Sequence, residues 1–336
     1  MKQARRKTCR RGATVSALKN SNSFIIGSRG SQLALQQAKT IQARLQTLSP
    51  HAEVHIEIIK TTGDRLKNAP LSIIGGQGVF TKELEEALLD ERIDIAVHSL
   101  KDLPTILPHG LHIAAITERE DPRDALVLPA HVSQQRSHLQ TSLASLPENA
   151  VVGTSSPRRS SQLKHLHPHL EIKELRGNVD TRLAKLDRGD YDAIILAAAG
   201  LRRLGSAERI TSYIPIEEIL PAVGQGALGI ETRTEDQRTN KFTQNLNDEP
   251  TALTCAAERA LLRSLGGGCQ LPIAAHAFIT NTNRLQLHGM VANRSGEIVI
   301  RDGVEGEANE PQRLGETLAE QLMKRGANRL LHELQS

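Results

Sequence analysis

Cys269 is the residue whose type and setting best suit covalent chemistry. It follows the triple-glycine run Gly266-Gly267-Gly268 and precedes Gln270. Glycine has no side-chain bulk and tolerates positive φ, so a large group can approach the sulfur closely. The helix-like run at 252–265 would deliver this sulfur to a loop, where functional residues concentrate. The alternative is a helix-capping Gly266 followed by a small, buried cysteine.

Asp102 is the second candidate. It ends the segment Ala96-Val97-His98-Ser99-Leu100-Lys101-Asp102, in which a predicted buried strand runs directly into polar residues. A carboxylate at a strand end beside cations can protonate a leaving amine or stabilise a cation that develops next to it. The simpler alternative is a carboxylate that pairs locally with Lys101 or caps a turn.

Arginines and hydroxyl residues recur where predicted strands end and helices begin, at 28–31, 154–159 and 176–182. Helix N-termini offer free N–H groups to anions, and arginine pairs with carboxylate or phosphate through two parallel hydrogen bonds. Three such turns predict one ligand with several negative groups. The alternative is that Ser31, Ser156 and Asn178 only cap helices, with the arginines on the surface.

The elements that must position these residues alternate between strand and helix. The apolar patterns predict strands at 24–27, 54–60, 93–97, 111–117, 151–153, 170–175, 193–197 and 227–231. They predict helices at 33–45, 80–91, 156–166 and 179–187, with a loop at 132–147. This rhythm is typical of two doubly wound α/β domains, which bind ligands beyond the carboxyl ends of their strands. From about residue 250, a helix, strands at 273–279, 285–291 and 297–301, and terminal helices predict a small α+β domain.

Composition limits the class of protein. The 336 residues suffice for two or three domains, and no apolar run is long enough to span a membrane. Aromatic residues make up only 2% of the chain, which argues against stacking surfaces for single-stranded nucleic acid. Three cysteines without a C-x-x-C pair favour reduced thiols in a cytosol-like compartment.

The formal charge of +4 comes from the N-terminus, where residues 1–20 hold seven cations and no acid, so the remaining chain carries −3. This basic segment is interpreted as a disordered extension, with an organelle transit peptide as the alternative. The histidines of 165–169 predict a solvated helix end rather than a metal site. Residues 118–124 are interpreted mostly as a salt-bridged linker, with a predicted hinge or crossover between the first two units as the alternative. The glycines of 75–78 are predicted to form a mobile loop or lid, and they lack the Walker ending.

In combination, the motifs resemble those of the porphobilinogen deaminase (hydroxymethylbilane synthase) family over nearly the whole chain. They are Ser-Arg-Gly-Ser-x-Leu-Ala, Gly-Gly-x-Gly-x-Phe-x-Lys-Glu-Leu, Asp-Ile-Ala-Val-His-Ser-x-Lys-Asp-x-Pro, Glu-Arg-x-Asp-Pro-Arg-Asp, Gly-Thr-Ser-Ser-x-Arg-Arg, Leu-Arg-Gly-Asn-Val-x-Thr-Arg, Leu-Pro-Ala-Val-Gly-Gln-Gly-Ala and Gly-Gly-Cys-Gln-x-Pro-Ile. The resemblance implies two periplasmic-binding-protein-like domains and a small C-terminal α+β domain. The expected limits are 1–22 for the extension, 23–117 with 222–244 for domain 1, 118–221 for domain 2 and 245–336 for domain 3.

The resemblance also implies the activity. Such an enzyme joins four porphobilinogen molecules into hydroxymethylbilane, with loss of ammonia, on a dipyrromethane cofactor held by a thioether, here at Cys269. Asp102 matches the catalytic aspartate, which aids loss of the amine and stabilises the resulting azafulvene. The matching cofactor- and substrate-binding positions are Arg29, Ser31, Lys82, Ser99, Lys101, Arg119, Thr154, Ser155, Ser156, Arg158, Arg159, Arg176, Arg182 and Gln225.

Two positions depart from the family pattern: Gln77 replaces a frequent lysine and Ser28 a frequent threonine. The expected partner is the small molecule porphobilinogen, without nucleic acid or membrane, for a monomer in the cytoplasm or, with a transit peptide, in the plastid stroma. Two rival functions are a non-catalytic anion-binding module and an acyl transferase that uses Cys269 with His98.

Overall fold

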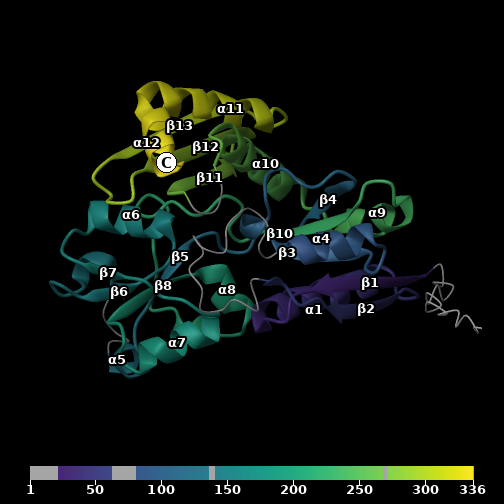
Figure 1. Ribbon diagram of the computed structural model, residues 1–336, viewed down its shortest axis with the longest axis horizontal. Coiled ribbons are helices and arrows are strands. Elements are labelled where there is room, and N and C mark those ends of the chain that lie inside the picture. Colours follow the sequence, from purple (N-terminus) through teal and green to yellow (C-terminus); the bar gives the residue numbers. More distant parts are fainter. Residues whose placement is uncertain (1–21, 63–80, 136–140, 268–270, 336) are drawn as a thin grey trace, which may run out of the picture.

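The computed structural model describes residues 22–62, 81–135, 141–267 and 271–335, which form three parts, each built on its own sheet (Figure 1). The first sheet has the order β2-β1-β3-β10-β4. Its strands are β1 (Ser23–Ser28), β2 (Glu53–Ile58), β3 (Ile95–Ser99), β4 (Leu111–Ile116) and β10 (Leu228–Arg233). Its helices are α1 (Gln32–Leu48), α4 (Lys82–Leu89) and α9 (Gln237–Thr243). Only β10 runs antiparallel to its neighbours, because the chain enters it after leaving the second sheet.

The second sheet repeats this plan in the order β7-β6-β8-β5-β9. Its strands are β5 (Asp124–Val127), β6 (Val151–Gly153), β7 (Glu171–Lys173), β8 (Ala193–Ala197) and β9 (Ser212–Tyr213). Its helices are α5 (Ala130–Gln135), α6 (Pro157–Leu166), α7 (Val179–Asp187) and α8 (Ala198–Arg203). The sequence patterns missed β5 and β9 because each is too short to show an alternation, and α5 occupies the start of the predicted loop.

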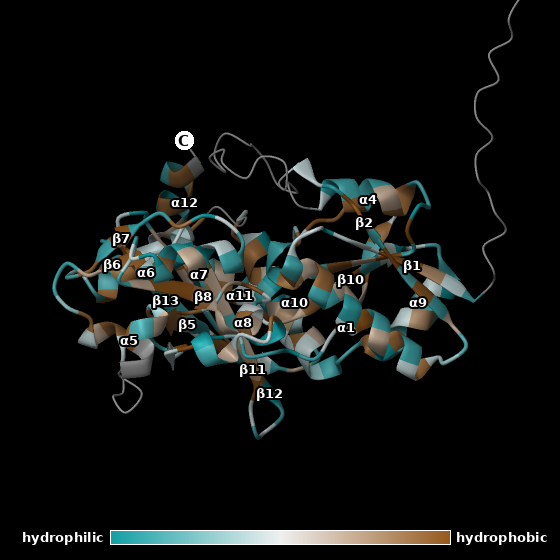
Figure 2. Cartoon of the chain, turned by 90° about the horizontal axis from the view of Figure 1, so that it is seen from below, coloured by the Kyte–Doolittle hydropathy of each residue, from teal (hydrophilic) through white to brown (hydrophobic). Residues whose placement is uncertain are grey.

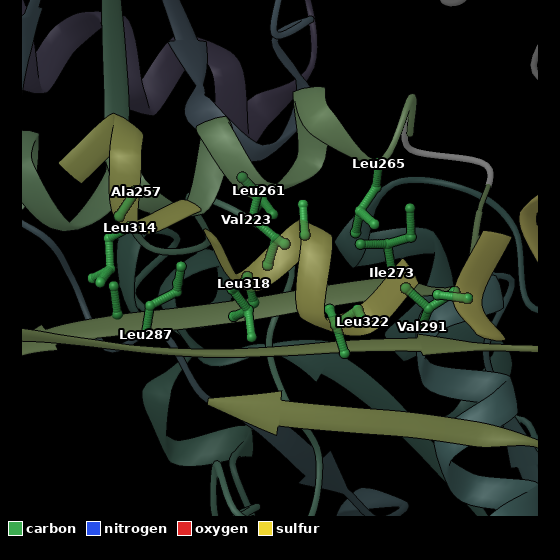
Figure 3. Close-up of a cluster of buried hydrophobic side chains, with 14 of the residues drawn as sticks. Val223, Ala257, Leu261, Leu265, Ile273, Leu287, Val291, Leu314, Leu318 and Leu322 are labelled. Atoms are coloured by element: carbon green, nitrogen blue, oxygen red, sulfur yellow. The ribbon is translucent and has the colours of Figure 1, made fainter. Parts of the chain in front are cut away.

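The third sheet is antiparallel, in the order β11-β12-β13. Its elements are β11 (Ile273–Ile279), β12 (Arg284–Ala292), β13 (Val299–Glu307), α10 (Glu249–Ser264), α11 (Pro311–Leu322) and α12 (Asn328–Gln335). Leu261, Leu287 and Leu318 belong to the buried core between the helices and this sheet (Figure 3). The strand predicted at 297–301 begins and ends earlier in the sequence than β13. The last residues of β13, up to Glu307, alternate between exposed and partly buried and lack an apolar pattern.

Helix α1 shows why the sequence folds locally as predicted. The Ser31 hydroxyl caps it by accepting a hydrogen bond from the Ala34 amide at 3.3 Å. Ala38, Ile41 and Leu45 lie three or four positions apart and are fully buried against the first sheet. In Figure 2, hydrophobic residues concentrate in the strands, whereas the helices carry hydrophilic residues on their outer faces.

The predicted fold class is confirmed: two α/β parts with mainly parallel sheets and a small C-terminal α+β part. The domain limits stay a prediction. Within the described residues, no helix is both long enough and apolar enough to cross a lipid bilayer.

Candidate active site

A pocket lies at the carboxyl ends of β1 and β3. Arg29, Ser31, Ser99 and Asp102 all line it, so the first sheet brings together side chains from two separate motifs. Asp102 ends the 3-10 turn Leu100–Asp102 and is exposed. An exposed carboxylate that shares a pocket with an arginine and two hydroxyls can accept hydrogen bonds from, or, when protonated, donate a proton to, a ligand bound there.

Gln37 was not among the predicted site residues, and His98 was named only for the rival acyl transfer. Both line the pocket. The Gln37 carboxamide donates a hydrogen bond to the Ser99 hydroxyl at 2.9 Å, and His98 Nε2 lies 2.8 Å from the buried Glu231 carboxylate. Gln37 follows Ser31 by six positions and interrupts the apolar face of α1, a signal that could have indicated a functional role.

A buried polar chain links this pocket to the second sheet. Lys101 Nζ donates to Gln225 Oε1 at 3.3 Å, and Gln225 Nε2 donates to Asp124 Oδ1 at 2.8 Å. Asp124 also pairs with Arg158 at 2.9 Å and with Arg159 at 2.7 Å. The arginines are therefore not surface residues, and the side-chain cap of α6 by Ser156 is long, at 3.5 Å.

Positive charge exceeds negative charge in this region. Burial lowers the pKa of Lys101 to about 8; Asp102 opposes the shift, while Arg159 adds to it. Burial and the charge of Arg159 likewise lower the pKa of Arg182 to about 10, against the effect of Asp102. Burial opposes ionisation of Asp124, yet its two arginine partners hold its pKa well below the usual range. Crowded, poorly hydrated cations of this kind favour a polyanionic ligand.

The other predicted contacts at the second sheet lie around the ends of β6 and β7. Thr154 accepts a hydrogen bond from the Ser156 amide at 3.2 Å, and the Ser155 hydroxyl donates to the Leu175 carbonyl at 2.7 Å. Arg176 pairs with Glu174. Asn178 occupies the N-cap position of α7 without a side-chain cap bond.

Arg119 has a different setting from the other predicted site residues. Its guanidinium donates to Glu258 at 2.7 and 3.2 Å and to the Gln225 carbonyl at 2.9 Å. Burial disfavours its charge, but the Glu258 carboxylate raises the pKa of Arg119 above its ordinary value. Arg119 therefore joins the predicted hinge to α10 of the C-terminal part.

Residues of the 118–124 segment form ion pairs, as the salt-bridged interpretation predicted. Arg123 pairs with Asp121, and Glu120 pairs with Arg202. Asp124 is the exception, since it begins β5 and is buried rather than forming part of a solvated linker.

Several predicted features are separate from this cluster or fall outside the described residues. Lys82 begins α4, is largely exposed and lies 3.9 Å from Glu86. Gly266 follows α10 with φ of 63°, which confirms the helix-ending glycine. Cys269, Gln77 and the glycine loop at 75–78 lie outside the described residues, as does the extension up to residue 21.

The histidines at 165–169 have separate partners. His165 Nδ1 lies 2.9 Å from the Gly296 carbonyl, and His167 Nε2 lies 2.7 Å from Glu218. Across the described ranges, three or more potential ligands nowhere gather into a metal site.

Comparison with known proteins agrees with this geometry. The family described as porphobilinogen deaminase, dipyromethane cofactor binding domain, matches residues 24–241, and its C-terminal domain matches residues 252–324. The chain belongs to the porphobilinogen deaminase family. The porphobilinogen deaminase of Synechococcus elongatus is 51% identical over 92% of this chain and 94% of its own length. That of Syntrophobacter fumaroxidans is 46% identical over 92% and 97%.

The chain also shows distant similarity to solved structures. A point mutant of full-length BenM is 16% identical over 75% of this chain and 70% of its own, with a TM-score of 0.39.

Proposed function

We propose that the chain is a porphobilinogen deaminase, a transferase that joins four porphobilinogen molecules head to tail into hydroxymethylbilane for tetrapyrrole biosynthesis. Family membership over both matched regions supports this function. The observation at the site that best supports it is that Lys101 and Arg182 both interact with Asp102 and with Arg159. Each pyrrole of the substrate and product bears an acetate and a propionate, so a growing chain requires this surplus of cations.

The residues fit a dipyrromethane cofactor. Within the described part of the chain, the Nε atoms of Arg158 and Arg159 are buried without a hydrogen-bond partner, so these guanidiniums can still donate. A ligand carboxylate can accept such hydrogen bonds. When bound through Cys269, the cofactor supplies a primer to which the substrate units are added. We assign its carboxylates to Lys101, Arg158, Arg159 and Arg182, with Thr154, Ser155, Ser156 and Arg176 at the rim of the same site.

The reacting porphobilinogen binds in the pocket beside Asp102. Arg29 and Ser31 bind a carboxylate of porphobilinogen, and Ser99, held by Gln37, donates or accepts a further hydrogen bond. The Asp102 carboxylate assists departure of the substrate amine and offsets the positive charge that then develops on the pyrrole nitrogen. Gln225 acts by joining the two halves of the site, and Arg119 acts by holding the adjoining segment on α10. We place Lys82 at the outer edge of the site.

Intact-mass spectrometry tests the function directly. We expect a mass excess of two linked pyrroles on the purified chain, absent from Cys269→Ser, and release of four ammonia molecules per tetrapyrrole formed. Asp102→Asn should keep the mass excess and lose about 10²–10⁴-fold in turnover. A bare chain mass together with reversible capture of an unrelated anion would instead favour the anion-binding module. We further propose that the enzyme acts as a cytoplasmic monomer.

A further inference from the structure

Arg259 on α10 binds the main chain of the two residues that follow the proposed catalytic Asp102. Its Nη1 donates to the Leu103 carbonyl at 3.1 Å, and its Nη2 donates to the Pro104 carbonyl at 2.6 Å. These two carbonyls belong to the residues that immediately follow Asp102. One planar guanidinium thus binds two successive peptide oxygens, which restrains the orientation of that segment.

The same helix also supports this segment from its buried side. Leu100 and Leu103, which flank Lys101 and Asp102, pack in one apolar cluster with Cys255 and the partly buried Ala252 of α10. Ala252, Cys255 and Arg259 are spaced three and four positions apart, so they share one helix face. The turn that carries Asp102 therefore rests on a helix of the C-terminal part, both through apolar packing and through Arg259.

The neighbouring residue fixes the same helix to the hinge. Glu258 accepts hydrogen bonds from Arg119 at 2.7 Å and from the Gly224 amide at 2.7 Å. Consecutive residues of α10 thus contact the hinge and the Asp102 turn. One helix therefore connects the 118–124 segment with the turn that carries Asp102.

The turn itself has few other main-chain restraints. The Leu103 amide donates to the Leu100 carbonyl at 3.2 Å, and the Leu100 amide donates to the Ala227 carbonyl at 3.0 Å. Pro104 fixes its own φ but has no N–H with which to anchor the segment. The two carbonyls that Arg259 binds follow this 3-10 turn and precede a loop, so they belong to no strand of the first sheet.

We propose that Arg259 is a positioning residue, which sets the orientation of the Asp102 carboxylate in the pocket of the first sheet. This inference rests on the proposed function for the role of Asp102. Loss of the two hydrogen bonds frees the Leu103–Pro104 peptide and misplaces the carboxylate. Misplacement of a reacting group by about 1 Å can reduce the rate about 100-fold.

The test compares Arg259→Met, which keeps the aliphatic stem, with Arg263→Met, which removes an exposed arginine from the last turn of the same helix. We expect Arg259→Met to lower kcat about 10- to 100-fold with KM changed less than threefold and an undiminished mass excess on the chain. Arg263→Met should match the wild type. Equal kcat in the two variants, within twofold, would overturn the proposal.

Amide hydrogen exchange provides a readout that is independent of activity. Arg259→Met should exchange faster than the wild type in a peptide covering residues 100–107, and unchanged in peptides of the second sheet. Equal exchange in that peptide for Arg259→Met and Arg263→Met would refute the restraint. Exchange that rises throughout the chain would point to general destabilisation and count against a specific positioning role.

Arg259→Lys decides the matter if the methionine variant does not fold. A lysine ammonium lacks the guanidinium fork, so kcat and exchange at 100–107 should both lie between those of the wild type and those expected without the contact. Wild-type values for both would overturn the proposal. If the wild-type chain itself released no ammonia from porphobilinogen, the proposed function would fail, while the exchange comparison would still decide whether Arg259 restrains the turn.

Discussion

Replacement of Glu258 by glutamine should strongly destabilise the protein. The Glu258 side chain is fully buried and accepts four hydrogen bonds: from Arg119 Nη1 at 2.7 Å, Arg119 Nη2 at 3.2 Å, the Gly224 amide at 2.7 Å and the Ala277 amide at 2.9 Å. A glutamine has the same shape but one oxygen fewer. Its NH2 group must therefore face either the Gly224 or the Ala277 N–H, together with one Arg119 nitrogen.

The size of the effect follows from these contacts. One buried backbone N–H without an acceptor costs about 1–3 kcal/mol. A buried charge that loses its partner costs about 3–5 kcal/mol in total, including its unmade hydrogen bonds. Because Arg119 remains almost buried, with an 11% exposed side chain, water relieves little of this cost. We therefore expect Glu258→Gln to lower the free energy of unfolding by about 3–5 kcal/mol.

Urea unfolding measures this free energy. The chain has no tryptophan, so circular dichroism at 222 nm is the suitable signal, with gel filtration as the second probe. The free energies are compared only where both probes report the same transition, since a chain of three parts need not unfold in two states. Glu316→Gln on α11 removes an exposed carboxylate and serves as the matched control, with an expected effect below about 0.5 kcal/mol.

A double-mutant cycle tests the assigned cause. Arg119→Met and Glu258→Gln disrupt the same ion pair, so their combined cost should fall short of the sum of the single costs by more than about 0.5 kcal/mol. A Glu258→Gln cost below about 1 kcal/mol, or strictly additive costs, would show that the buried pair does not hold α10 on the hinge.

Three further predictions follow from the described geometry. Gly226→Ala should lower the free energy of unfolding in urea by about 1–3 kcal/mol more than Gly205→Ala. Both glycines have positive φ, but only a Cβ at Gly226 meets a backbone oxygen, that of Glu120 at 2.2 Å. Equal costs for the two variants would contradict this packing. Burial lowers the pKa of His276 from 6.5 to about 4, so the unfolded chain takes up the proton first as pH falls. Stability is thus lost between these values, by about 2 kcal/mol at pH 5, and His276→Gln, unfolded in urea at pH 7 and pH 5, should remove that part of the loss. The pKa of Lys101 is about 8, so the side chain loses its charge as pH rises through this value and kcat/KM should fall on the alkaline side. Lys101→Arg keeps the charge and should retain activity to higher pH. A pH profile of the variant with the same alkaline fall as the wild type would exclude Lys101 as the cause of that fall.

Local patterns predicted most of the elements and several of the residues that line the pocket of the first sheet. The apolar spacing of α1 and the cap at Ser31 were readable because both depend on residues within one or two helical turns. The pocket around Arg29 and Asp102 was predictable for a similar reason, since parallel strands bring their carboxyl ends to one edge of the sheet. The roles assigned to these residues stay proposals, with Cys269 outside the described residues.

The sequence by itself therefore determined most of the elements, their order and the family, because hydrophobic periodicity and contiguous motifs are local properties of the chain. Only the tertiary structure decided which charges are partners. Asp124 was interpreted as part of a salt-bridged linker and is the buried partner of two arginines. Glu258, which no sequence pattern singled out, binds Arg119, 139 positions away. Burial and pairing depend on segments that meet only after folding, and the energy of a charge is set by those neighbours rather than by its position in the chain.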